Sequence, residues 1–529
     1  MKLDVGEFEI KDKDLAARIG RLGTPHGIIE TPVLFPVIDP LRQEVSLDEI
    51  REIGFNAIIT NAYLLWRRRR EEALSKGIHQ LLSFDGIIMT DSGAYQILRY
   101  GSVEIDAIEV VEFQKSIGSD IAVILDEPTG NVKDRRQAEE SVRITLERAR
   151  QSLQYIDDKR IWVLPVQGGS FLDLVEYSAR ESSKLAEKYG MYALGSPTVH
   201  LERYEYAILL DMIYHAKRHL PLTKPLHLFG AGHPMIIPFA VALGVDAFDS
   251  ASYILYARDN RYLTLSRTYR LEDLDYFPCN CPICRKYNPR DLLEMPRLER
   301  VRLLAIHNLH VLHQAILEVK VAIREGRLWE LLEERSRAHP SLYTAFKKFR
   351  KYSNWLTNLA PVVKGGEVHG IFLFNEEGLW RPEVLSHHKR LINNYKPRGR
   401  KLLLVPGDLR EKPFKAPEEV YRGINGERHI VFYTPFLGAI PEELVETYPL
   451  SQFEISLPVS SEVIAETARR VHEYIYKNKE NYKEIIIVID QAIEYSNQLA
   501  KEIASLLDKT GLSYKLMIIK GGSIKETRE

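Results

Sequence analysis

Carboxylate and amide side chains stand at the ends of several short apolar runs between residues 34 and 250. Asp91, Asp126 and Asp249 could act as nucleophiles or as general acids and bases, and Gln167 could bind a polar ligand. Short polar residues at such places can also simply cap the helices that follow. For a single Asp the two interpretations are equally open, but three Asp and one Gln in equivalent positions favour a catalytic site.

The apolar runs alternate with longer stretches of helical spacing, a pattern typical of stacked βα units. Strands are predicted at residues 34–38, 57–60, 86–90, 121–125, 161–166, 192–194, 226–229 and 247–248. Eight such strands within roughly 250 residues favour an α/β fold of the TIM (β/α)₈ barrel type over an open doubly wound sheet. Active sites of these barrels lie at the carboxyl ends of the strands, so the polar residues should share one rim. Residues 8–25 are expected to form a lid or hairpin across the opposite end.

Cys279, Cys281 and Cys284 are the three cysteines of the chain, and they are too close together to form a distributed disulfide framework. A strong helical pattern follows at residues 298–324 and carries His307, His310 and His313. Three thiolates and one imidazole would form a closed tetrahedral Zn²⁺ site with a structural role. Spacing alone does not select among the three histidines, and reduced thiols that merely cluster are the alternative.

The composition is that of a globular protein of 529 residues, with 45% hydrophobic and 27% charged residues. Lys and Arg total 72 and Asp and Glu total 73, so no overall basic charge points to nucleic acid. The first residues lack the pattern of a signal or transit peptide, and no apolar stretch approaches the ~20 residues needed to cross a bilayer. A soluble cytoplasmic protein without a membrane partner is therefore expected.

The domain organisation expected from these patterns has three parts. Residues 1–358 form the barrel with its zinc-binding region at about 279–324, residues 359–426 a small domain, and residues 427–529 a small α+β domain. Basic residues gather at 67–70, 346–352, 387–390 and 396–401. Each stretch could bind phosphates or form an ordinary solvated helix face, and 67–70 is the best placed because it follows a rim loop.

Several of these motifs together resemble the tRNA-guanine transglycosylase family. The resemblance covers roughly residues 4–338 and rests on Thr90-Asp91-Ser92-Gly93-Ala94-Tyr95-Gln96, Leu125-Asp126-Glu127-Pro128, Val166-Gln167-Gly168-Gly169, Asp246-Ala247-Phe248-Asp249-Ser250 and the cysteine loop with His307-Asn308. The later segment 434–444 is similar to the archaeal branch, which exchanges a guanine in the D arm of tRNA for the precursor base preQ0. The family's fold is a TIM barrel with an inserted structural zinc site.

The resemblance also implies a cofactor and partners. The zinc ligands would be Cys279, Cys281, Cys284 and His307, and the zinc region would contribute to a homodimer interface. The partners would be tRNA, guanine and preQ0. Archaeal members often carry an RNA-binding PUA domain, which we do not find in this sequence, so its function would be missing or supplied by a separate PUA-domain protein.

By the same resemblance, Asp249 is the nucleophile of a double displacement through a covalent Asp–ribose intermediate. Asp246 is its rival, but strand alternation turns it to the opposite side. Asp91 would be the general acid and base, and Ser92, Asp126, Gln167 and the backbone at Gly195 would bind the purine. The target nucleotide must be flipped out of the tRNA to reach the rim. Such an exchange requires no redox cofactor or nucleoside triphosphate.

Three other interpretations stay open at this point. A queuine-type transglycosylase acting on an anticodon guanine would use nearly the same pocket. A noncatalytic RNA-binding subunit could retain the barrel and the zinc scaffold, although the presence of all three aspartates disfavours it. A barrel glycosidase would share the paired carboxylates but would not explain the zinc loop.

Overall fold

The computed structural model of the chain describes residues 3–94, 105–361, 369–421, 427–520 and 523–527. These residues fall into two compact units, Met1–Lys348 and Phe349–Glu529. Within the described residues, no helix is both long and apolar enough to cross a membrane.

The first unit is built around a closed barrel of eight parallel strands, as expected. In chain order these strands are β4 (Val33–Ile38), β5 (Ala57–Asn61), β6 (Ile87–Asp91), β7 (Ile121–Val123), β8 (Ile161–Val166), β9 (Met191–Leu194), β10 (Leu226–Leu228) and β11 (Ala247–Ser250). Ile, Val and Ala dominate them because parallel strands covered by helices are buried on both faces. Sequential strands are neighbours, and β11 closes the barrel by pairing with β4.

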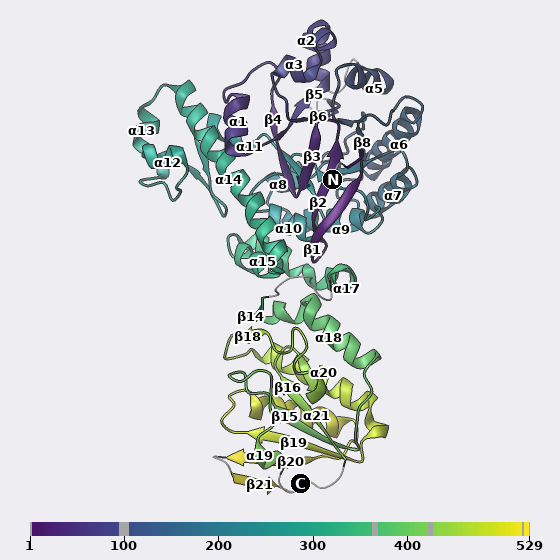
Figure 1. Cartoon of the computed structure of the whole chain (residues 1–529), viewed down its shortest axis with the longest axis vertical. Coiled ribbons are helices and arrows are strands. Elements are labelled where there is room, and N and C mark those ends of the chain that lie inside the picture. The colour runs from purple at the N-terminus through teal and green to yellow at the C-terminus, as the bar shows by residue number, and fades with distance from the viewer. Residues whose placement is uncertain (1–2, 95–104, 362–368, 422–426, 521–522, 528–529) are drawn as a thin grey trace. The chain divides into compact units, whose positions relative to one another are not determined.

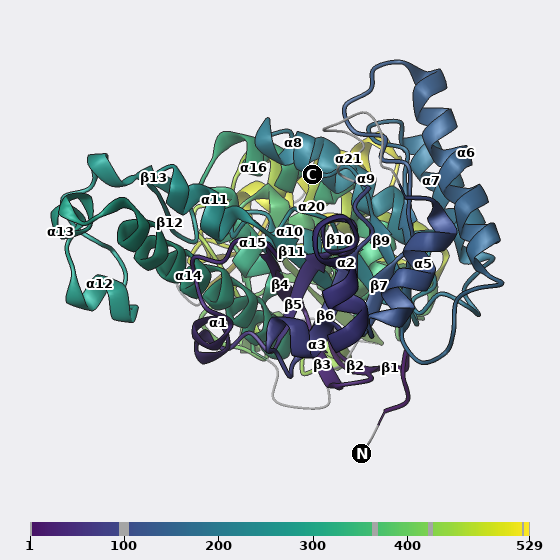
Figure 2. The same cartoon turned by 90° about the horizontal axis from the view of Figure 1, so that it is seen from above.

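Helices follow the strands and cover the outside of the barrel, as α5, α6 and α7 show (Figure 2). They are α1 (Leu47–Ile53), α2 (Ala62–Lys76), α3 (Ile78–Leu82), α5 (Ala107–Ser116), α6 (Arg135–Ser152), α7 (Leu172–Ser183), α8 (Thr198–Glu202), α9 (Tyr206–Lys217), α10 (Ile237–Ala242) and α11 (Ser252–Arg258). The sequence pattern did not identify α2 and α3, since the arginine and glutamate run of α2 hides any apolar stripe.

A three-stranded antiparallel sheet covers the amino-terminal end of the barrel. It comprises β1 (Phe8–Asp14), β2 (Ala17–Thr24) and β3 (Gly27–Thr31), so the expected hairpin gains a third strand. Leu22 and Ile29 pack in one apolar cluster with Ile87, Ile121 and Ile161, which begin β6, β7 and β8. The opposite end, where the strands finish, is therefore left for chemistry.

The cysteine region and a long helix follow the last barrel strand. The elements are β12 (Arg261–Leu263), β13 (Thr268–Arg270), α12 (Pro282–Lys286), α13 (Pro289–Glu294), α14 (Arg297–Glu325), α15 (Leu328–Ser336) and α16 (Pro340–Lys347). Helices α12 and α13 lie to one side of the barrel, beyond α14, in both views (Figures 1 and 2). The apolar face of α14 packs on α11, which anchors this region to the barrel.

The second unit contains a six-stranded mixed sheet in the order β17-β16-β15-β19-β20-β21. Its strands are β15 (Lys401–Pro406), β16 (Arg428–Thr434), β17 (Gly438–Pro441), β19 (Glu484–Asp490), β20 (Lys515–Lys520) and β21 (Ser523–Thr527), while β14 (Ile371–Leu373) pairs with β18 (Phe453–Ile455). The helices are α17 (Phe349–Leu359), α18 (Pro382–Asn393), α19 (Glu418–Tyr421), α20 (Ser461–Lys477) and α21 (Ser496–Lys509). Apolar clusters lie on both faces of this sheet.

The domain boundaries differ from those expected. Strands β15 and β16 pair in parallel, with Lys401 opposite Arg428, so a boundary at residue 426 would divide one sheet. The chain instead separates once, between Lys348 and Phe349. Residues 422–426, beside the expected boundary, lie outside the described residues. The turn-rich sequence between Pro406 and Arg428 therefore connects two paired strands and does not separate two domains. Pairing between strands that are distant in sequence leaves no local signal, so the sequence alone did not reveal it.

Candidate active site and metal centre

The predicted rim residues lie at the carboxyl ends of neighbouring barrel strands. Asn61 and Asp91 end β5 and β6 and are register partners, and the Asn61 amide donates to Asp91 Oδ2 at 3.1 Å. The backbone N–H of Gly93 lies 3.3 Å from the same oxygen. Tyr95 and Gln96, which belong to the motif that follows, lie outside the described residues. The rim arrangement expected from the sequence is therefore present at these strands.

Three carboxylates repel one another at this rim. Burial, followed by the negative charges of Asp126 and Asp249, raises the pKa of Asp91 to about 7. A carboxyl group with that pKa exchanges a proton readily near neutral pH, as a general acid and base must. The electrostatics thus distinguish Asp91 from an ordinary helix cap, whose pKa would fall.

Asp249, near the end of β11, has one oxygen held and one oxygen open. Its Oδ1 accepts hydrogen bonds from His227 Nε2 and from the backbone N–H of Gly230, both at 2.8 Å. Among the described residues, no hydrogen bond reaches Oδ2. The carboxylate is therefore fixed by two donors on one oxygen, while its second oxygen stays available for a reacting atom.

His227 is a site residue that the sequence interpretation missed. It sits in the middle of β10, is fully buried, and pairs in register with Ala247, two residues before Asp249. Alternation along a strand puts residues two apart on the same face, so His227 and Asp249 share one side. The signal was available in Leu226-His227-Leu228, where an imidazole interrupts an apolar strand, but such a residue usually reads as part of the core.

Asp126 and Gln167 are joined by a hydrogen bond at the rim. Gln167 Nε2 donates to Asp126 Oδ2 at 2.5 Å, and its Oε1 accepts from the backbone N–H of Thr129 at 3.1 Å. Burial raises the pKa of Asp126 to about 6, although the bond from Gln167 opposes this shift. The amide is thus oriented by its neighbours, and Asp126 is ionised above this value and able to accept hydrogen bonds.

Ser92 and Gly195 complete the residues predicted for this pocket. Ser92 is fully buried beside Asp91. The backbone N–H of Gly195 already donates to the carbonyl of Val166 at 2.9 Å, so its carbonyl is the group left for a ligand. A side chain at position 195 would collide with the Gln167 amide, which explains the need for glycine there.

Asp246 has a structural environment instead of a reactive one. Its Oδ1 accepts from Arg18 Nε at 3.0 Å, and its Oδ2 accepts from the backbone N–H of Leu226 at 2.8 Å. Lys217 Nζ lies 3.7 Å from Asp246 Oδ2, and both side chains are buried. This arrangement agrees with the expectation that Asp246 faces away from the side occupied by Asp249.

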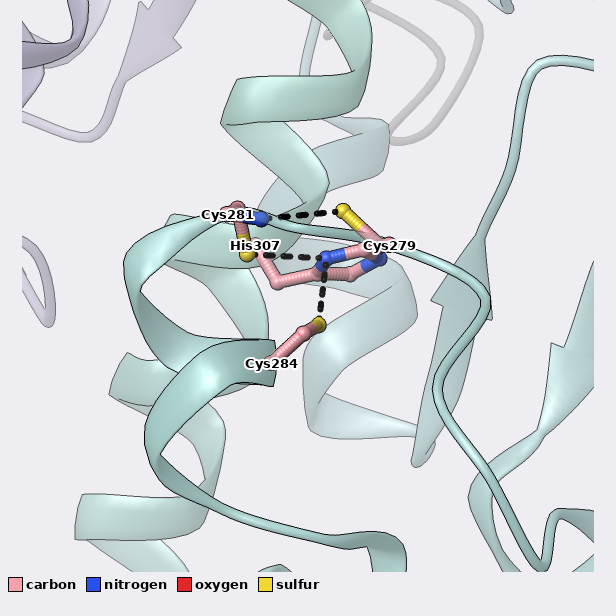
Figure 3. Close-up of side chains that lie close together, drawn as sticks. All are labelled: Cys279, Cys281, Cys284 and His307. Carbon is pink, nitrogen blue, oxygen red and sulfur yellow. Dashed lines mark hydrogen bonds between the residues drawn. The ribbon is translucent and has the colours of Figure 1, made fainter.

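A second cluster brings Cys279, Cys281, Cys284 and His307 together (Figure 3). His307 Nδ1 lies 3.5 Å from Cys281 Sγ and 3.3 Å from Cys284 Sγ, and its Nε2 donates to the carbonyl of Leu263 at 2.9 Å. That bond places the proton on Nε2 and turns the Nδ1 lone pair toward the sulfurs, as in metal-binding histidines. Of the histidines on α14, His307 is the one that reaches the three sulfurs, whereas His313 packs against the ring of Phe55. These four residues can hold a metal ion.

Fold and site together define a TIM-barrel enzyme with carboxylates gathered at its rim and a separate Cys₃His group that can hold a metal ion. The sequence model described as queuine tRNA-ribosyltransferase matches residues 12–341. This chain belongs to that family of transferases, which confirms the resemblance seen in its motifs.

Archaeal relatives extend the similarity well beyond the barrel. A tRNA-guanine(15) transglycosylase of Aeropyrum pernix is 53% identical over 473 residues, covering 88% of this chain and 91% of the relative. The protein of the same name from Sulfolobus acidocaldarius is 46% identical over 487 residues, covering 92% and 95%. One from Pyrococcus furiosus is 42% identical and covers 84% of this chain and 70% of the relative. The similarity therefore includes most of the second unit.

Proposed function

We propose that this chain exchanges guanine 15 in the D arm of tRNA for preQ0, 7-cyano-7-deazaguanine, by double displacement at the ribose. The observation that carries the proposal is the Asp249 carboxylate, which is fixed by two donors on Oδ1 and open at Oδ2 beside the proton-exchanging Asp91. The archaeal relatives named tRNA-guanine(15) transglycosylase support guanine 15 as the base that is replaced.

In the first displacement, Asp249 Oδ2 attacks the anomeric carbon of the flipped nucleotide and the bond to guanine breaks. Protonated Asp91 gives its proton to the departing nitrogen, so guanine leaves as a neutral base. The product of this half-reaction is an ester between Asp249 and the ribose, as in retaining glycosidases.

In the second displacement, Asp91 removes a proton from the incoming base, whose nitrogen then attacks the same carbon. Asp249 leaves as a carboxylate, and retention of configuration follows from two inversions. His227 and Gly230 stabilise the negative charge that returns to Oδ1 at this step.

Asp126, Gln167, Ser92 and the Gly195 carbonyl would recognise the purine edge common to guanine and preQ0. Asp126 accepts hydrogen bonds from the base N–H groups once it is ionised, and Gln167 is held against it. A base that leaves these buried groups unpaired is rejected strongly, which explains selection for a guanine-like edge.

The tRNA backbone requires cations near the rim. Helix α2 begins directly after Asn61 and carries Arg67, Arg68 and Arg70 as exposed side chains. Their position favours a role in phosphate contact, which would make binding salt-dependent. In contrast, Phe346 and Tyr352 of another basic stretch are buried, so their rings are not available to stack on bases. Self-association and a separate PUA-domain protein stay predictions.

The metal proposed for the Cys₃His centre is a structural Zn²⁺, because thiolates with one imidazole form a closed tetrahedral set. Cys281→Ala should bind one equivalent of zinc fewer than the wild type and make residues 275–296 sensitive to proteases. Zinc contributes folding free energy only where its ligands are complete. Metal analysis and limited proteolysis check this; His310→Ala, on the same helix but outside the cluster, should behave as wild type. Full zinc content in Cys281→Ala would contradict the assignment.

Replacing His227 should slow release of the nucleotide from Asp249. A hydrogen bond to a charged group contributes about 1.5–3 kcal/mol, so His227→Leu should lower kcat by about 10- to 150-fold. The covalent adduct should accumulate, because its breakdown needs the stabilised carboxylate. Quenched-flow measurement of adduct and product separates this effect from misfolding. His227→Gln, which retains a donor, should recover part of the rate; equal adduct levels in all three proteins would oppose the assignment.

Incorporation of labelled guanine into unmodified archaeal tRNA tests the proposed function directly. Loss of label when guanine 15 is substituted, but not when an anticodon guanine is, would support it. Excess unlabelled preQ0 should then displace the label. The description of the family model also fits a queuine-type enzyme. Loss of label only on anticodon substitution would establish that function instead, while no incorporation would favour a noncatalytic subunit.

A further inference from the structure

A second group of metal-binding side chains lies at the amino-terminal end of the barrel, away from the rim. His26 is in the turn between β2 and β3, His79 is on α3, and Asp120 directly precedes β7. Asp120 is fully buried, whereas the His26 side chain is 45% exposed. Three separate segments thus meet at a point that solvent can reach from one side.

The ligand atoms of these residues converge on one small volume. His26 Nδ1 lies 2.6 Å from Asp120 Oδ1, and His79 Nε2 lies 3.1 Å from Asp120 Oδ2. The three ligand atoms are all within 4.8 Å of one another, and the two imidazole rings have centroids 3.8 Å apart. Zinc bonds to N and O of about 2.0–2.2 Å would fit between them after small side-chain rotations.

His79 carries the strongest indication of a missing ligand. Its Nδ1 lies 3.0 Å from the carbonyl oxygen of Phe84, which can only accept, so this nitrogen holds the proton. Nε2 of the neutral ring is then a bare lone pair directed at a carboxylate. It is buried, and its contact with Asp120 Oδ2 at 3.1 Å is favourable only with a proton or a metal ion between the two atoms. A lone pair facing a carboxylate is repelled unless a cation lies between them.

Asp120 is held in place for this role. The backbone N–H of Ile88 donates to Asp120 Oδ2 at 2.8 Å, which fixes the carboxylate at the start of β7. The carbonyl of Phe84 likewise fixes the tautomer and the orientation of His79. Such outer contacts, here a backbone group behind two of the three ligands, are typical of metal sites.

We propose that His26, His79 and Asp120 form a second metal site that binds a divalent transition ion such as Zn²⁺, Co²⁺ or Ni²⁺. Two imidazoles and one carboxylate suit these ions, whereas Mg²⁺ and Ca²⁺ prefer oxygen ligands alone. Water from the exposed side of His26 completes the coordination. The ion ties the β2–β3 turn to α3 and β7, and so fastens the three-stranded sheet over the end of the barrel.

Zinc and cobalt binding to the full chain test this site independently of activity. The wild type should retain two equivalents of zinc, and His26→Ala, a substitution at an exposed turn, should retain one. In a Co²⁺ titration of metal-free protein, one equivalent gives thiolate-to-cobalt charge transfer from the Cys₃His centre. The second equivalent should add ligand-field absorption without further charge transfer, and His26→Ala should lack it.

The matched control is His472→Ala, a partly exposed histidine of the second unit that should keep both equivalents. Thermal unfolding followed by circular dichroism verifies that each variant is folded. A wild type that saturates at one equivalent would overturn the proposal, and so would a folded His26→Ala that still binds two. In the first case, His79 holds a second proton and pairs with Asp120 as an imidazolium.

Discussion

Asp249→Asn should reduce base exchange by about 10⁴-fold or more, because an amide oxygen cannot form the ester with ribose. The substitution is nearly isosteric. The amide oxygen can take the place of Oδ1 and accept from His227 Nε2 and the Gly230 N–H, so the fold should be unaffected. Single-turnover release of labelled guanine measures the loss. A denaturing gel with labelled tRNA measures the covalent adduct, which should be absent.

The matched control is Asp158→Asn, an exposed residue that precedes β8 and so lies at the opposite end of that strand from Gln167. It should retain wild-type exchange and adduct formation. tRNA binding by Asp249→Asn should stay within a few-fold of the wild type, since the purine pocket and the cationic surface are unchanged. Appreciable turnover by Asp249→Asn would exclude the double displacement and favour a mechanism without a covalent intermediate.

The barrel could be predicted from the sequence because each strand is an apolar run that ends in a polar residue. Residues 161–166 were predicted with the observed bounds, and most other strands differ by one residue at an end. The last strand is longer than expected, so Asp249 lies within β11 instead of after it. This changes its surroundings, since a strand residue is fixed by its neighbours β10 and β4.

Parts of the site escaped prediction because they depend on contacts between strands. The pairing of His227 with Asp249 requires the register of β10 against β11, which no local pattern contains. The raised pKa of Asp91 depends first on burial in the assembled barrel and then on two carboxylates from other strand ends. In the second unit, parallel pairing of β15 with β16 joins segments that the sequence separates by turn-rich residues. Residue types therefore indicated the chemistry, while the pKa of Asp91 and the hydrogen bonds to Asp249 depend on the assembled barrel.

Asp91→Asn should have opposite effects on activity and stability. Loss of the general acid and base should lower kcat/KM by about 10²- to 10⁴-fold. In the wild type, kcat/KM for tRNA should fall on the acid side as Asp126, with a pKa of about 6, gains a proton. It should fall on the alkaline side as Asp91, with a pKa of about 7, loses one. The alkaline limb should disappear in Asp91→Asn, although interacting carboxylates share their apparent values.

The stability change follows from the direction of the same pKa shift. The pKa of Asp91 is 3.8 in the unfolded chain and about 7 in the folded one, so between these values the folded state binds more protons and wild-type stability falls as pH rises. Asp91→Asn removes the buried charge and should be more stable at pH 8 by roughly 1–3 kcal/mol, a value reduced by partial solvent exposure. The advantage should shrink as pH falls below 7 and vanish near 3.8.

Urea unfolding at pH 8 and at pH 4.5 distinguishes this electrostatic strain from a general effect of the substitution. The difference between Asp91→Asn and wild type should be large at the higher pH and small at the lower one, whereas Asp158→Asn should match wild type at both. A variant that loses activity without gaining stability at pH 8 would mean that burial and the charges of Asp126 and Asp249 do not raise the pKa of Asp91. Asp91 would then be ionised near neutral pH, and the proton for the departing base would have to come from solvent or substrate. A gain confined to high pH would instead show that keeping the charge of Asp91 buried beside Asp126 and Asp249 costs folding free energy, as a functional site can.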